Sequence, residues 1–201
     1  MDLSKLNIGV LAVQGDFERH EHQIRLLGAR SRQVRLPAQL EGLHGLIMPG
    51  GESTTMDIMF DRFNLRQPLL DFAAKKPVYG TCAGMIMLAR NVVDNLARIK
   101  TLGLMDIDVI RNGYGRQVFS FDDELPVHLD NGPQTVRATF IRAPKVTRVG
   151  PQVTVLAEYQ DSPVLLRQGR ILAGAFHTEL DDDTRLLKFF VTNFLMPQPQ
   201  L

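Results

Sequence analysis

Residues 77–84 read PVYGTCAG, and the apolar stretch MIMLA follows directly at residues 85–89. The pattern predicts a buried strand that turns sharply at G-x-C-x-G and enters a helix, a nucleophile elbow with cysteine where hydrolases have serine. Flanking glycines let the backbone turn tightly, and the N-terminus of a helix favours the thiolate over the thiol. Cys82 is therefore a candidate nucleophile; the alternative is a buried cysteine that only packs.

The segments around this elbow alternate between strand and helix patterns. Apolar runs predict buried strands at 7–13, 33–36, 45–48 and 78–80, and helical spacing predicts helices at 17–27, 54–64 and 68–75. After residue 100, strand-like runs follow at 106–111, 117–121, 135–141, 153–159, 164–167 and 171–176, and the next helix is expected at 184–195. We therefore expect one domain over residues 1–196 with a frayed tail at 197–201. Its fold class would be α/β, flavodoxin-like and doubly wound, a mostly parallel sheet between helices with an antiparallel extension.

The composition narrows the function classes. The 201 residues include 23 Lys and Arg against 22 Asp and Glu, a net charge of +1, which indicates no broad surface for nucleic acid or anionic membrane. The longest apolar run, residues 78–89, is shorter than the roughly 20 residues that cross a bilayer. The first apolar run ends in Gln-Gly-Asp, which is not a signal-peptide cleavage site, and the single cysteine excludes an internal disulfide. A cytoplasmic location fits best.

The histidines differ in their surroundings. His20 and His22, two apart on a predicted helix, would point to different faces, so they make a poor metal pair and are expected on a solvated face. No metal or cofactor site is predicted. His177 follows a strand-like run, and Glu179 lies two positions on, which in extended backbone is the same side. With Cys82 these residues suggest a Cys–His–Glu triad, in which the carboxylate fixes the imidazole tautomer.

Residues 46–55, LIMPGGESTT, form a third candidate segment, which passes from a strand into a helix through Gly50 and Gly51. Two consecutive glycines can turn backbone N–H groups toward a developing anion. A phosphate-binding loop is a competing interpretation, although the lysine of a P-loop is missing. The other competing interpretation is a turn that only caps the following helix.

The motifs PGGEST, GTCAG and FHTEL together resemble those of the class I (triad) glutamine amidotransferases. Three further stretches, IGVLAVQGD, IRNGYGRQ and FIRAP, are similar to the family of glutaminase subunits of pyridoxal 5′-phosphate synthase. The resemblance covers essentially the whole chain. One position departs from it, because Thr178 stands where that family often has proline between histidine and glutamate.

The resemblance implies hydrolysis of L-glutamine to L-glutamate and ammonia through a thioester. The ammonia would pass to a synthase subunit that makes pyridoxal 5′-phosphate, in a ring-shaped synthase dodecamer carrying up to twelve glutaminase subunits. It implies Cys82 as nucleophile with His177 and Glu179 as relay, and backbone N–H groups of Gly51 and Ala83 as oxyanion donors. The implied glutamine-binding residues are Gly51, Glu52, Ser53, Arg111, Ile141 and Arg142. For Arg111 a surface salt bridge is an equal alternative.

Three rival functions stay open at the level of sequence. One is an amidotransferase subunit for another partner, such as one feeding imidazole glycerol phosphate synthesis. Another is a cysteine peptidase or chaperone of the same architecture. The non-enzyme alternative is a module for FMN or another small ligand, in which the glycine pair binds phosphate and Cys82 only packs.

Overall fold

A seven-stranded sheet forms the centre of the computed structural model, which describes residues 2–94, 96, 98–113, 120–129 and 132–196. The strand order is β10-β11-β12-β4-β3-β1-β2. Five strands are parallel: β1 (Asn7–Leu11), β2 (Arg30–Val34), β3 (Gly45–Met48), β4 (Val78–Thr81) and β12 (Ile171–Gly174). The antiparallel strands β10 (Thr154–Tyr159) and β11 (Ser162–Gln168) complete one edge.

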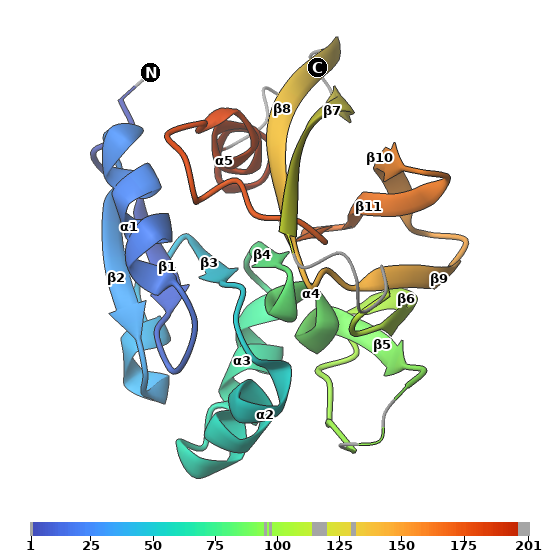
Figure 1. Cartoon of the computed structure of the whole chain (residues 1–201). Coiled ribbons are helices and arrows are strands. Elements are labelled where there is room, and N and C mark those ends of the chain that lie inside the picture. The colour runs from blue at the N-terminus through green and yellow to red at the C-terminus, as the bar shows by residue number, and fades with distance from the viewer. Residues whose placement is uncertain (1, 95, 97, 114–119, 130–131, 197–201) are drawn as a thin grey trace.

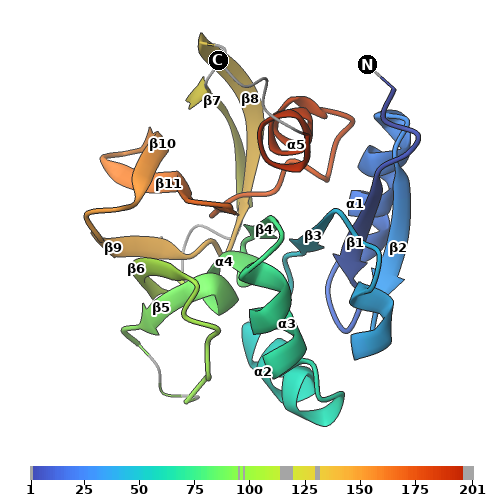
Figure 2. The same ribbon diagram turned by 180° about the vertical axis from the view of Figure 1, so that it is seen from behind.

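Helices lie on both sides of this sheet, as the alternation of patterns predicted. They are α1 (Phe17–Leu26), α2 (Ser53–Arg62), α3 (Arg66–Ala73), α4 (Ala83–Leu88) and α5 (Arg185–Phe190), with a 3-10 helix at Pro37–Leu40. Figures 1 and 2 show α5 on one side of β3 and β4, with α2 and α3 on the other. The doubly wound α/β class is confirmed. None of the helices in the described ranges is long and apolar enough to span a membrane.

The predicted antiparallel extension is present but divided. Strands β5 (Ala89–Val92), β6 (Met105–Ile110) and β9 (Lys145–Val149) form a separate three-stranded sheet. Strands β7 (Ser120–Leu129) and β8 (Gly132–Ile141) form a long ribbon that projects beside α5 (Figure 1).

Some element boundaries differ from those predicted. β5 and β9 were not expected, and the helix expected at 184–195 is α5 followed by a π-helical segment, Val191–Leu195. Residues 117–119 of the strand expected at 117–121, and the expected tail at 197–201, lie outside the described residues.

The strand order brings together segments that are distant in sequence. β12, β4 and β3 are neighbours and parallel, and all their residues are buried. The carboxyl ends of adjacent parallel strands lie at one edge of the sheet, where α/β proteins bind ligands. Gly50 follows β3, Cys82 follows β4 and His177 follows β12, so all three lie at this edge.

Candidate active site

Cys82 occupies the sharp turn between β4 and α4. Its φ of 49° and ψ of −105° are unusual for a residue with a side chain, and its N–H donates to the carbonyl of Gly174 at 2.8 Å. Glycine at position 84 lets the first turn of α4 approach β3, since a Cβ there would collide with the carbonyl oxygen of Met48. The residue is 7% exposed, and its sulfur lies 3.9 Å from the carbonyl oxygen of Ile141.

His177 and Glu179 form a short, buried pair. His177 Nδ1 lies 2.6 Å from Glu179 Oε1, and the two residues are 8% and 1% exposed. A carboxylate oxygen accepts, so Nδ1 carries the proton and Nε2 is left for the cavity. The backbone of His177 pairs with Thr139 of β8, at 2.8 Å and 3.0 Å. Gly50 packs against the imidazole, where a Cβ would collide with Cε1.

The charges of this pair reinforce each other. Burial alone would lower the pKa of His177, but hydrogen bonds with Cys82 and Glu179 and their charges raise it to about 10. Burial likewise would raise the pKa of Glu179, yet the neighbouring rings of His20 and His177 hold it well below its ordinary value. The site therefore favours an imidazolium between a sulfur and a carboxylate.

A cavity of about 250 Å³ opens at this edge of the sheet. Eight of the residues singled out from the sequence line it: Gly51, Glu52, Ser53, Cys82, Arg111, Ile141, Arg142 and His177. Glu179 lies behind His177, and Ala83 begins α4 next to the sulfur. Gly50, which the sequence analysis named with Gly51, lines it as well, whereas the remaining lining residues were not singled out from the sequence: Asp16, Ile86, Asn112 and Leu180. For Asp16 a signal existed, since it follows the first parallel strand.

The glycine pair and Glu52 have separate tasks. The Glu52 carboxylate caps α2, accepting from the backbone N–H groups of Thr54 at 3.2 Å and Thr55 at 2.8 Å. Its own N–H donates to Gln14 Oε1 at 2.8 Å. The capping turn expected as an alternative is therefore present, and it coexists with an exposed Gly51 whose φ is 146°.

Arg111 faces the cavity from the segment after β6. Its guanidinium donates to the Thr54 hydroxyl at 3.2 Å, and its backbone N–H donates to Asp94 at 3.1 Å. Nε is buried without a hydrogen-bond partner among the described residues, and no carboxylate in that part of the chain pairs with the guanidinium. The salt-bridge alternative thus finds no support. Arg142 is exposed, with a φ of 44°.

The expectation for His20 was wrong. Its side chain is buried at 1% exposure instead of solvated, and Nε2 lies 3.5 Å from Glu179 Oε1. His22, on the outer side of α1, has a side chain 46% exposed that meets Asp182 at 3.2 Å. The spacing on α1 shows that the two histidines face different ways, but only the tertiary structure shows which of them points inward.

Comparisons with known proteins place this chain in a family. The pyridoxal 5′-phosphate synthase subunit PdxT of Deinococcus radiodurans is 49% identical over 190 residues, which cover 92% of this chain and 96% of that protein. The protein of the same name from Desulforudis audaxviator is 46% identical, covering 92% and 97%.

A solved structure titled as a glutamine amidotransferase is 41% identical, with a TM-score of 0.86 and coverage of 92% and 97%. At 13% identity, PurLQS from Thermotoga maritima shares the fold alone, with a TM-score of 0.70 and coverage of 94% and 99%. The model of the SNO glutamine amidotransferase family matches residues 10–196. The chain therefore belongs to the SNO glutamine amidotransferase family, which confirms the glutamine-hydrolysing enzyme that the sequence motifs indicated.

Proposed function

We propose that this enzyme hydrolyses L-glutamine through a thioester on Cys82 and supplies the ammonia to the synthase subunit of a pyridoxal 5′-phosphate synthase. One observation supports the chemistry above all: a sulfur and an imidazole line the same cavity, and a buried carboxylate backs the imidazole at 2.6 Å. These are the nucleophile, proton carrier and orienting group of a triad.

The first half of the reaction uses the protonated imidazole. The Cys82 thiolate attacks the side-chain carbonyl carbon of glutamine and forms a tetrahedral oxyanion. His177 Nε2–H then gives its proton to the amide nitrogen, the C–N bond breaks, and ammonia leaves a γ-glutamyl thioester. The raised pKa of His177 suits this step, because the ring is protonated at neutral pH.

The second half regenerates the enzyme. His177, now neutral, takes a proton from water, and the hydroxide attacks the thioester carbonyl carbon. The tetrahedral intermediate collapses, the C–S bond breaks, and the new γ-carboxyl group leaves and releases its proton to solvent, which gives glutamate and restores the Cys82 thiolate beside the imidazolium. Glu179 stays ionised throughout and holds Nδ1, so the ring exchanges protons only at Nε2.

Backbone groups beside the sulfur are the oxyanion donors in this proposal. The Ala83 N–H belongs to the first turn of α4, whose dipole also favours negative charge. The Gly51 N–H is the second donor; Gly51 is exposed on the cavity wall, and the loop is tied to Gln14 through Glu52. Each such donor is worth on the order of 3 kcal/mol in comparable sites.

Arginines recognise the amino-acid end of the substrate. Arg111 Nε is buried in the cavity wall without a partner among the described residues, and a glutamine α-carboxylate would satisfy it with a charge-assisted bond. Arg142 lies exposed on the same cavity and can add a second contact. Ser53 and Ile141 also line the cavity and complete the proposed glutamine pocket.

The partner follows from the relatives. Proteins 46–49% identical over nearly their whole length bear the name of a pyridoxal 5′-phosphate synthase subunit, which favours that partner over one of imidazole glycerol phosphate synthesis. Free ammonia in neutral water is mostly ammonium and a poor nucleophile, so productive use requires a docked synthase. We propose a complex in which a dodecameric synthase ring carries up to twelve copies of this chain.

A glutaminase assay with and without the purified synthase subunit tests this function. We expect weak glutamate release by the chain alone, clear stimulation by the synthase, and no release by a folded Cys82→Ala variant. A rate of glutamate release that the synthase leaves unchanged would contradict the proposed partnership. Glutamate release by Cys82→Ala would contradict the chemistry, and so would failure of wild type with synthase to hydrolyse glutamine.

A further inference from the structure

The inner face of α1 carries two buried polar side chains. His20 and Gln23, three positions apart and so on one side of the helix, are each 1% exposed. Burying a polar group costs free energy unless it finds a hydrogen-bond partner. Each of the two side chains finds a partner in the segment that contains Glu179, about 160 residues further along the chain.

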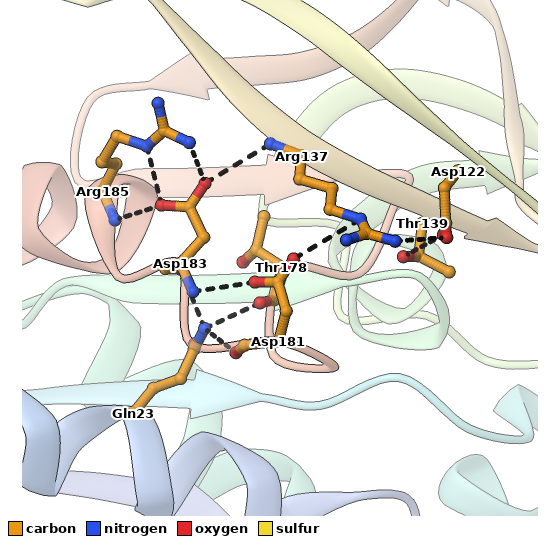
Figure 3. A network of polar contacts seen from close by, with 8 residues as sticks. All are labelled: Gln23, Asp122, Arg137, Thr139, Thr178, Asp181, Asp183 and Arg185. Carbon is orange, nitrogen blue, oxygen red and sulfur yellow. Dashed lines mark hydrogen bonds and ion pairs between the residues drawn. The ribbon is translucent and has the colours of Figure 1, made fainter.

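Gln23 fixes the backbone on either side of Glu179. Its Nε2 donates to the carbonyl of Thr178 at 2.7 Å and of Asp183 at 2.9 Å, with Asp181 at 3.3 Å (Figure 3). The segment from 178 to 183 is thereby tied to α1. On its other side, Asp183 accepts from Arg185 and from the backbone of Arg137 (Figure 3).

His20 contacts the carboxylate itself. Its Nε2 lies 3.5 Å from Glu179 Oε1, the same oxygen that accepts from His177 Nδ1 at 2.6 Å. An ionised carboxylate only accepts, so Nε2 carries a proton on this side. The same nitrogen lies 3.3 Å from Thr81 Oγ1, on the residue directly before Cys82. His20 therefore links the strand that carries the sulfur to the carboxylate that orients the imidazole.

We propose that His20 is a positioning residue for the hydrolysis: its single Nε2–H, shared between Glu179 Oε1 and Thr81 Oγ1, keeps the Glu179 carboxylate against His177 Nδ1. This inference rests on the proposed triad. Its physical basis is the burial of Glu179, which is 1% exposed and has a second oxygen, Oε2, without a partner among the described residues. Without His20, the carboxylate would keep only His177 as a partner within the described part of the chain.

The electrostatics agree with this geometry. The neighbouring His20 ring is one of the groups that lower the pKa of Glu179 against the opposing effect of burial. A buried carboxylate that loses one of two partners is stabilised less as an anion and is free to rotate. Either change weakens its hold on the His177 tautomer, which acts on catalysis and leaves the cavity residues that bind glutamine in place.

Steady-state glutaminase kinetics with the synthase subunit present test the proposal on two variants. His20→Leu keeps an apolar side chain of similar size but removes the donor, whereas His20→Gln retains an N–H at a similar reach. We expect His20→Leu to lower kcat by about 10- to 100-fold with KM within about three-fold, as for other supporting contacts of catalytic groups. His20→Gln should recover most of the lost kcat.

Controls separate positioning from packing. His22→Leu and His22→Gln alter the same residue type on the exposed side of the same helix, and they should keep kcat within about two-fold. Thermal unfolding checks that each variant folds. If His20→Leu does not fold, His20→Asn replaces it, because its shorter amide cannot reach Glu179.

Three results would overturn the inference: a kcat for His20→Leu within two-fold of wild type, an equal loss in His20→Gln, or a loss in KM alone. If Cys82→Ala is inactive while His20→Leu is fully active, only the role of His20 fails. If Cys82→Ala still hydrolyses glutamine, the proposed function fails as well.

Discussion

At the scale of single residues, the site is organised by one carboxylate. Glu179 is almost completely buried and ionised, and it receives His177 at 2.6 Å. The pair places a positive ring beside the sulfur of Cys82. The negative charge of Glu179, and not only its shape, is therefore what the proposed mechanism requires.

Replacing that charge tests the requirement. Glu179→Gln keeps the size of the side chain and an oxygen that can accept from Nδ1, but it no longer stabilises the imidazolium. We expect kcat for glutamine hydrolysis to fall by roughly 10²- to 10⁴-fold. Steady-state glutaminase assays measure this, and unchanged circular dichroism excludes unfolding. A variant within three-fold of wild type would argue against the relay.

The pair of Glu179 and His177 also predicts a pH range in which it stabilises the fold most. The lowered pKa of Glu179 gives stability that is fully present above its ordinary 4.5 and lost as pH falls. The raised pKa of His177 gives stability that is fully present below its ordinary 6.5 and lost as pH rises toward about 10. Relative to the double variant His177→Ala, Glu179→Ala, wild type should gain most in Tm between pH 4.5 and 6.5. An equal gain at pH 6 and pH 10 would contradict this.

At the scale of elements, the site is a meeting of three strand ends. β3, β4 and β12 are adjacent and parallel, and each is followed at once by a segment of the cavity. Position 50, in the loop after β3, has to be a glycine, because the His177 ring occupies the space that a Cβ would take. The three strands are entirely buried, and they therefore fix the positions of the cavity segments that follow them.

Gly50→Ala tests that junction. The added methyl displaces the His177 ring, so we expect kcat to fall by roughly 100-fold, the size expected for a misplacement of about 1 Å. The stability should fall too, because the methyl has to be accommodated in a packed site. Glutaminase kinetics and thermal unfolding measure the two effects. Wild-type kcat would show that the ring has room to move.

The sequence predicted those parts of the fold whose signals are local. The elbow at Cys82 and the pair His177 and Glu179 each follow a buried strand, so a short stretch of sequence locates them. β5 follows α4 directly and has the polar, exposed Arg90 and Asn91 at its centre, and β9 has exposed residues that gain order by pairing with β6. Such strands are defined by tertiary contacts, which a local pattern does not contain.

His20 shows the same limit within the site. The spacing along α1 separates it from His22, but its partners are Thr81, 61 positions away, and the still more distant Glu179. Phe17, Ile24 and Leu27 pack on the core from the same side of α1 as His20. The apolar spacing marks that inner face, but the polar partners of His20 are visible only in the tertiary structure.

At the scale of the whole molecule, the β7–β8 ribbon supports the edge of the central sheet that carries the candidate active site. Phe140 on β8 is buried and packs against Phe121 and Phe176, with ring centroids 4.8 Å and 5.6 Å apart. Phe176 precedes His177, whose backbone pairs with Thr139. The ribbon, the last parallel strand and the site are thus one packed unit.

Removing the aromatic contact should therefore affect both stability and activity. We expect Phe140→Ala to lower the free energy of unfolding by about 3–5 kcal/mol and to reduce kcat in the folded fraction. Urea denaturation measures the first effect. Leu96→Ala is the control: this side chain is 95% exposed, so the change should stay within about 0.5 kcal/mol. Equal effects of the two substitutions would contradict the packing role.

In the proposed mechanism, Cys82 carries the glutamyl group during turnover. Mixing the enzyme and its synthase subunit with ¹³C-labelled glutamine, quenching in acid within milliseconds to seconds and analysing the Cys82 peptide by mass spectrometry tests it directly. We expect one labelled glutamyl group on Cys82 during turnover, and neither adduct nor glutamate release in Cys82→Ala. Labelled glutamate released at the wild-type rate by Cys82→Ala would contradict it.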